Sequence, residues 1–95
     1  MNLSTDLTCT IERIKQMELY FDKISAILQT SKYPLQDLEA LKVELAILED
    51  YYDSGQWLDD YETDESGALP SDLKRGVLAQ DSLYDLFSDI KDFVQ

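Results

Sequence analysis

Residues 34–53, PLQDLEALKVELAILEDYYD, carry the apolar pattern that decides the fold. Pro34 has the fixed φ and the missing N–H that suit the first turn of a helix, and Gly55, just beyond the segment, is a natural helix stop. Between them, apolar residues recur every three or four positions, which is the spacing of one helical face. A second apolar row widens this face, so we expect the helix to contact more than one neighbour. The first row comprises Leu35, Leu38, Leu41, Leu45, Leu48 and Tyr52, and the second comprises Ala40, Val43, Ile47 and Tyr51.

The segment before Pro34 has the same rhythm and predicts a helix over residues 7–30, because neither Gly nor Pro interrupts the first 33 residues. The short link between the two helices indicates an antiparallel hairpin. The apolar face of the first helix comprises Ile11, Ile14, Met17, Phe21, Ile24 and Leu28.

Two shorter helices are predicted beyond Gly55. Residues 56–65 are compatible with a short acidic helix ended by Gly67, and residues 80–94 carry an apolar face at helical spacing. No stretch alternates as a strand does. The prediction is one all-α domain over residues 1–95, in which a long antiparallel helical hairpin (helices 7–30 and 34–53) is closed by a short acidic helix or loop and by a C-terminal helix.

The charge balance narrows the function. The 95 residues hold 20 Asp and Glu against 8 Lys and Arg, with no His, for a net charge of −12. This disfavours direct binding to nucleic acid, and the lack of His excludes His-dependent catalysis and the common zinc and haem sites. We therefore expect no enzymatic activity, no catalytic residue, no metal and no cofactor.

The lone cysteine and the hydropathy indicate the cytoplasm. Cys9 has no second cysteine with which to form an internal disulfide, which fits a reducing compartment. The N-terminus lacks the basic and apolar regions of a signal peptide. The longest apolar run, residues 45–48, is far below the roughly 20 residues that cross a bilayer, so we expect no membrane association.

The acidic stretch over residues 49–65 is the strongest local anomaly, and it has three interpretations: a solvated face, a contact surface for a basic partner, or a cation site. Three of its acids stand at the spacing of calcium ligands in an EF-hand loop. However, Glu65 and Ser71 occupy the positions that require Gly and Glu. The three acids are Asp60, Glu62 and Asp64.

The only adjacent basic pair, Lys74 and Arg75, follows a run without positive charge. We expect both residues to form structural ion pairs with Asp59, Asp60 or Glu62. The alternative is an anion site, but the glycine-rich loop of a phosphate-binding motif is missing.

A stripe of aspartates marks the last predicted helix, with steps of four, four and three residues. Its interpretations are the solvated back of a packed helix or a surface that imitates nucleic acid. Trp57 and Tyr61 are predicted anchors, in the core or in a partner contact. The stripe consists of Asp81, Asp85, Asp89 and Asp92.

Three stretches, YYDSGQWLDDYE (51–62), LPSDLKRGVL (69–78) and DSLYDL (81–86), resemble the bacterial domain-of-unknown-function family 4298. The resemblance extends over almost the whole chain. It implies a small, cytosolic, helical bacterial protein with no assigned activity, cofactor or catalytic residue. Two departures fall at the start of the last helix, where the family tends to carry Ser-Glu-Asp and this chain has Ala79-Gln80-Asp81. Ala79 lacks the hydroxyl that would cap the last helix, a loss of about 1 kcal/mol.

The leading hypothesis is a non-enzymatic protein-interaction module. Its negative net charge favours a basic protein as the partner. A nucleic-acid mimic that blocks a basic DNA- or RNA-binding protein is the alternative, and a cation-binding module is the third. A homodimer is a further hypothesis, because a hairpin with a wide second helix leaves apolar surface uncovered in so short a chain.

Overall fold

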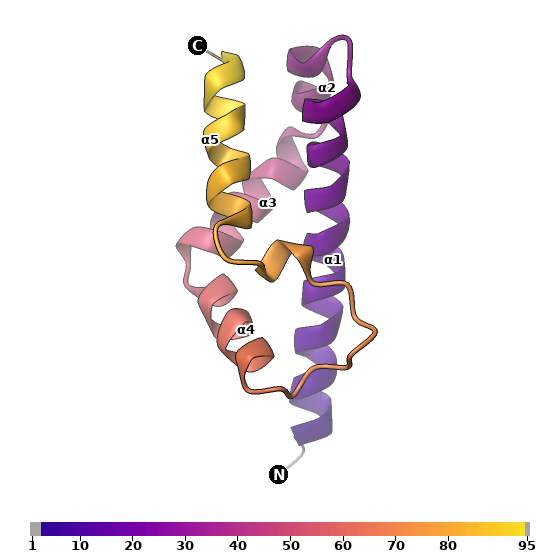
Figure 1. Ribbon diagram of the computed structural model, residues 1–95, viewed down its shortest axis with the longest axis vertical. Coiled ribbons are helices and arrows are strands. Elements are labelled where there is room, and N and C mark those ends of the chain that lie inside the picture. Colours follow the sequence, from indigo (N-terminus) through magenta and orange to yellow (C-terminus); the bar gives the residue numbers. More distant parts are fainter. Residues whose placement is uncertain (1–2, 95) are drawn as a thin grey trace.

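The computed structural model describes the backbone of residues 3–94 and the side chains of residues 7–92, and every regular element in this range is helical (Figure 1). The all-α prediction is confirmed. None of the described helices combines the length and the apolar character that a membrane crossing requires. The elements are α1 (Leu3–Thr30), α2 (Pro34–Ala40), α3 (Lys42–Asp53), α4 (Gln56–Glu65), the short 3-10 helix η1 (Gly76–Leu78) and α5 (Ser82–Val94).

Helix α1 is the spine of an elongated molecule that measures 48 × 21 × 19 Å. Its 28 residues extend over about 42 Å at 1.5 Å per residue. After residues 31–33 the chain turns back, so that α2 and α3 run against the direction of α1, while α5 later runs along it (Figure 1). A loop from α4 crosses to α1, and η1 then leads into α5.

The prediction of a single helix over residues 34–53 is wrong in one respect, because the helix is interrupted at Leu41. This residue has φ −107° and ψ 21°, outside helical values, and its N–H bonds to Leu38 O at 3.0 Å. In a straight helix, Leu38 and Leu48 would point about 80° apart at 100° per residue. Both are buried on either side of the break.

Two glycines in the left-handed region end helices, as the sequence predicted. Gly55, with φ 90°, separates α3 from α4, and Gly67, with φ 80°, follows the last turn of α4. A side chain with a Cβ is disfavoured in this conformation, so glycine suits both positions.

The last helix begins at Ser82 rather than at the predicted Gln80. Asp81 adopts φ 70°, and its carbonyl accepts the N–H of Asp85 at 2.8 Å. Asp81 therefore precedes the first turn of α5 instead of lying within it. The Ser82 hydroxyl donates to Val77 O at 2.9 Å, which joins α5 to η1.

A single apolar core runs between α1 and the later elements, with contributions from every helix except α4 among the fully buried apolar residues. Helix α4 contributes Trp57, which is partly buried against this core. The buried apolar residues are Ile14, Met17, Ile24, Leu38, Leu48, Tyr51, Leu69, Val77, Leu78, Leu83 and Leu86.

The environment of Trp57 makes it part of the packing. Its ring is 5.5 Å from the ring of Tyr52 and stacks on Tyr61 at 5.2 Å. Its indole N–H donates to Val77 O at 2.9 Å. Trp57 thus ties α4 to α3 through Tyr52 and to η1 through Val77.

We therefore expect Trp57→Ala to lower the free energy of unfolding by about 2–4 kcal/mol, because it removes apolar contact and one hydrogen bond. Trp57→Phe keeps an aromatic ring and loses the hydrogen bond, so its effect should be smaller. Thermal and urea unfolding measure both. A melting curve unchanged by Trp57→Ala would assign Trp57 to a surface contact instead.

Candidate functional site

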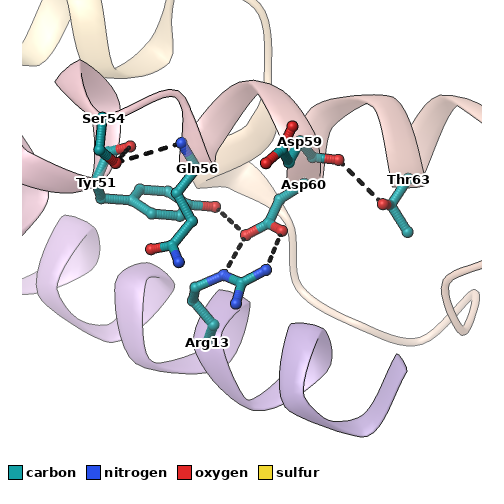
Figure 2. A network of polar contacts seen from close by, with 7 residues as sticks. All are labelled: Arg13, Tyr51, Ser54, Gln56, Asp59, Asp60 and Thr63. Carbon is teal, nitrogen blue, oxygen red and sulfur yellow. Dashed lines mark hydrogen bonds and ion pairs between the residues drawn. The ribbon is translucent and has the colours of Figure 1, made fainter. Parts of the chain in front are cut away.

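A carboxylate buried among three helices is the main polar feature of the interior. Asp60 of α4 is 1% exposed. Arg13 of α1 donates to it twice, from Nε to Oδ2 at 2.9 Å and from Nη2 to Oδ1 at 2.6 Å (Figure 2). Tyr51 of α3 donates its hydroxyl to Oδ2 at 2.7 Å. The two side chains approach the carboxylate from α1 and α3, so Asp60 joins α4 to both.

The network shifts the pKa values of Arg13 and Tyr51. The hydrogen bond and the negative charge of Asp60 raise the pKa of Arg13, against an opposing effect of burial. Burial, followed by the hydrogen bond to Asp60, raises the pKa of Tyr51 well above its ordinary value. Arg13 therefore stays charged and Tyr51 stays protonated, and neither is poised to exchange a proton near neutral pH.

A second buried carboxylate, Glu18 of α1, holds η1 in place. Its Oε1 accepts the backbone N–H of Val77 at 2.8 Å. A Cβ at Gly76 would lie 3.1 Å from Glu18 Oε2, so glycine allows this close approach. Burial is the largest cause that raises the pKa of Glu18 above 4.5, and the negative charge of Asp22 adds to it. The hydrogen bond from Val77 and the charge of Lys74 oppose the shift.

The backbone of Val77 connects four elements. Its N–H bonds to Glu18 of α1, while its carbonyl accepts both the Trp57 indole of α4 and the Ser82 hydroxyl of α5. Val77 itself is fully buried in η1. Among the described side chains, every buried nitrogen and oxygen atom has a hydrogen-bond partner.

The adjacent basic pair forms ion pairs, but with other acids than those predicted. Arg75 Nη1 bonds to Asp64 Oδ1, and Nη2 donates to Pro70 O at 2.5 Å. Lys74 Nζ lies 3.3 Å from Asp22 Oδ2 of α1. The prediction of Asp59, Asp60 or Glu62 as partners is wrong, because Asp60 is engaged with Arg13 and the loop places Lys74 and Arg75 beside Asp22 and Asp64.

The acids proposed as an EF-hand-like loop lie in helix α4 instead. Asp60 and Asp64 each form an ion pair with an arginine, and Glu62 is exposed. Among the residues that the structure describes, no three Cys, Asp or Glu side chains form a group that could hold a metal ion.

The remaining predicted residues divide between packing and surface. Tyr61 is partly buried and stacks on Trp57. The aspartates of the predicted stripe do not take part in the buried networks. Asp81, Asp85, Asp89 and Asp92 are all exposed.

Arg13, Glu18 and Tyr51 are buried or partly buried polar residues that the sequence pattern did not predict as part of a site. Tyr51 was assigned to an apolar row, whereas its hydroxyl also completes the bonding of Asp60. One signal was available for Arg13: it stands seven residues before Tyr20 and fourteen before Ile27, both partly buried and on the same helical face. A charged residue on a helical face that is otherwise apolar or aromatic indicates an oppositely charged partner in the interior.

These features define a small acidic all-α protein whose interior is tied together by two buried carboxylates. The chain belongs to the family described as Domain of unknown function (DUF4298), which matches residues 14–95. A comparison with curated proteins gave no match, and neither did a comparison with solved structures.

Asp60→Asn tests the central network. The change leaves Arg13 without its counter-ion in a site where the acid is fully buried, so we expect a loss of about 2–4 kcal/mol in the free energy of unfolding. Asp59→Asn, on the exposed neighbouring position, removes the same charge and should change it by less than about 0.5 kcal/mol. Equal effects in urea unfolding would contradict a structural role for the Asp60 carboxylate.

Glu18→Gln tests the second carboxylate through pH. Because the pKa of Glu18 is raised on folding, its contribution to stability is fully present below the ordinary 4.5 and is lost as pH rises through the folded value. Glutamine still accepts the Val77 N–H but does not ionise. We expect the variant to match or exceed the wild-type stability at pH 7, with a flatter pH dependence above 4.5.

Urea unfolding at several pH values measures the effect of Glu18→Gln, and Glu12→Gln, exposed on the same helix, is the matched control. A loss of more than about 1 kcal/mol at pH 7 would mean that the charged hydrogen bond outweighs the cost of burial.

Proposed function

We propose that this protein is a non-enzymatic interaction module of the bacterial cytosol that binds a basic protein partner. The observation that carries the proposal is Tyr84 on α5, which is 62% exposed on a helix whose aspartates also face solvent. Tyrosine is enriched among residues that dominate binding energy, and a negative surface attracts a basic partner. Exposed Tyr84 thus supplies apolar contact where the surrounding field selects positive charge.

The pairing of the basic residues supports the same proposal. Arg13, Lys42, Lys74 and Arg75 all form ion pairs with acids of the same chain. With a net charge of −12, acids outnumber bases by twelve, so the outward field stays negative. The buried polar groups are bonded to one another, which supports a structural and not a catalytic role for them.

The proposal includes the finer architecture and the setting. The long antiparallel hairpin of α1 against α2 and α3, closed by α4 and α5, is the scaffold that presents α5. The lone exposed Cys9 is compatible with a reducing cytosol.

A nucleic-acid mimic is the second candidate, favoured by the exposed aspartate just before α5, Asp81, and the three along α5, Asp85, Asp89 and Asp92. Such a protein competes with DNA or RNA for the basic groove of its target. A partner of the mimic would bind the aspartate stripe, whereas the general module does not require the stripe.

Capture of cytosolic proteins on the immobilised chain at two salt concentrations tests the proposal. We expect basic proteins to be retained at low salt. Their retention should fall at moderate salt, because salt screens the electrostatic attraction. The module predicts that Tyr84→Ala reduces capture and that duplex DNA does not displace the captured protein.

Two variants of equal charge separate the candidates. One replaces Asp81, Asp85 and Asp89 by Asn, and the other replaces the exposed Asp59, Glu62 and Glu65 of α4 by Asn or Gln. A mimic loses its partners only with the first variant and releases them to duplex DNA. Retention of no basic protein by the wild type would contradict both candidates.

A further inference from the structure

A groove opens between α3 and α5, on the side of α5 that presents Tyr84. Its volume is about 470 Å³, within the roughly 300–1,000 Å³ of ligand pockets. Phe87 and Ile90, both partly buried against the core, supply its apolar surface. Phe87 also contacts Tyr52 of α3 edge-on, with ring centroids 5.8 Å apart, so the groove lies beside an aromatic contact between the two helices.

The charges at the groove are mainly negative. Glu49 and Asp53, four residues apart on α3, line one side, and both are exposed. Lys91 is the only basic residue among those that line it, and neither Glu49 nor Asp53 pairs with it within the 4.0 Å of an ion pair in the described residues.

A third helix is the occupant that suits a groove between two helices. Amphipathic helices bind by laying an apolar face into such a groove, with anchors at every third or fourth residue. In helical bundles, a helix packs its side chains between those of neighbouring helices. A second copy of this chain is disfavoured here, because it would bring another −12 charges to the same acidic surface.

We infer that the α3–α5 groove binds a basic amphipathic helix of a partner protein, with apolar anchors against Tyr84, Phe87 and Ile90 and with Lys or Arg beside Glu49 and Asp53. This inference rests on the proposed function and names the surface and the form of the partner. It places the recognition on the groove side of α5 and not on its aspartate stripe.

The probe is a labelled synthetic helix of leucine and lysine, about 18 residues or five turns long, with leucines along one face. One control peptide replaces each lysine by glutamate, and another shuffles the leucines so that no apolar face forms. Fluorescence anisotropy at fixed low salt gives the dissociation constants, and amide chemical shifts of the labelled protein locate the contact.

Two double charge reversals provide the matched comparison. Glu49→Lys with Asp53→Lys changes the groove, while Asp85→Lys with Asp89→Lys changes exposed residues of the aspartate stripe on α5. Both pairs have the same i, i+4 spacing and the same change of net charge. We expect the first reversal to raise the dissociation constant of the leucine–lysine helix by about tenfold or more. The second should raise it by about threefold or less.

A second pair of variants tests the apolar anchor. Tyr84→Ala should weaken binding by at least about fivefold, since tyrosines at binding sites are often dominant contacts. Tyr33→Ala removes an equally exposed tyrosine from the turn between α1 and α2 and should leave the dissociation constant unchanged. Circular dichroism checks that each variant keeps its helices.

The outcomes distinguish failure of the inferred binding site from failure of the proposed function. Equal weakening by the two charge reversals overturns the groove while leaving a preference for basic partners intact. If the leucine–glutamate helix binds as tightly as the leucine–lysine helix, the basic partner fails, and with it the proposed function. Sedimentation as a dimer that Tyr84→Asp converts to a monomer overturns the inference, because a second copy then fills the groove.

Discussion

The buried ion pair between Asp60 and Arg13 is the constraint on which the arrangement of the helices depends. A carboxylate that is 1% exposed is costly to bury unless charged and hydrogen-bonding partners surround it. Helix α4 can therefore pack only where Arg13 of α1 and Tyr51 of α3 reach Asp60 together (Figure 2). An apolar contact tolerates sliding of one helix along another, whereas the two parallel bonds from the guanidinium fix both position and orientation.

Hydrogen bonds to the backbone of Val77 connect α4 to the later part of the chain. Once Asp60 sets α4, Trp57 donates to the Val77 carbonyl, and the Ser82 hydroxyl donates to the same atom from the start of α5. Glu18 holds the Val77 N–H from the other side. The groove between α3 and α5 is therefore placed by contacts that begin at the two buried carboxylates, even though neither lines that groove.

The sequence predicted what depends on local spacing and missed what depends on distant pairing. Apolar periodicity and two glycines were enough for the helical class and for the bounds of α4. The break at Leu41 has neither Gly nor Pro beside it, so no local residue announced it. Arg13 and Asp60 are 47 residues apart, and Glu18 and Val77 are 59 apart, which places their partnership beyond any motif. For Lys74 and Arg75 an ion-paired state was predicted, but the partners, Asp22 of α1 and Asp64 of α4, depend on where the loop before η1 lies in the fold.

The distribution of charge connects the fold to the proposed binding. Of the four basic residues in ion pairs, three bridge separate parts of the chain: α1 with α4, α1 with the loop before η1, and that loop with α4. The acids they engage are those that position elements, while the acids of α5 and of the α3 rim remain exposed. A chain with an even balance of charge would neutralise its own surface, whereas one with 20 acids and 8 bases keeps a negative field after its structural pairs are formed. Arg13 and Arg75 are partly buried and pair with two acids of α4, while the acids that remain exposed supply the field that a basic helix would meet at the groove.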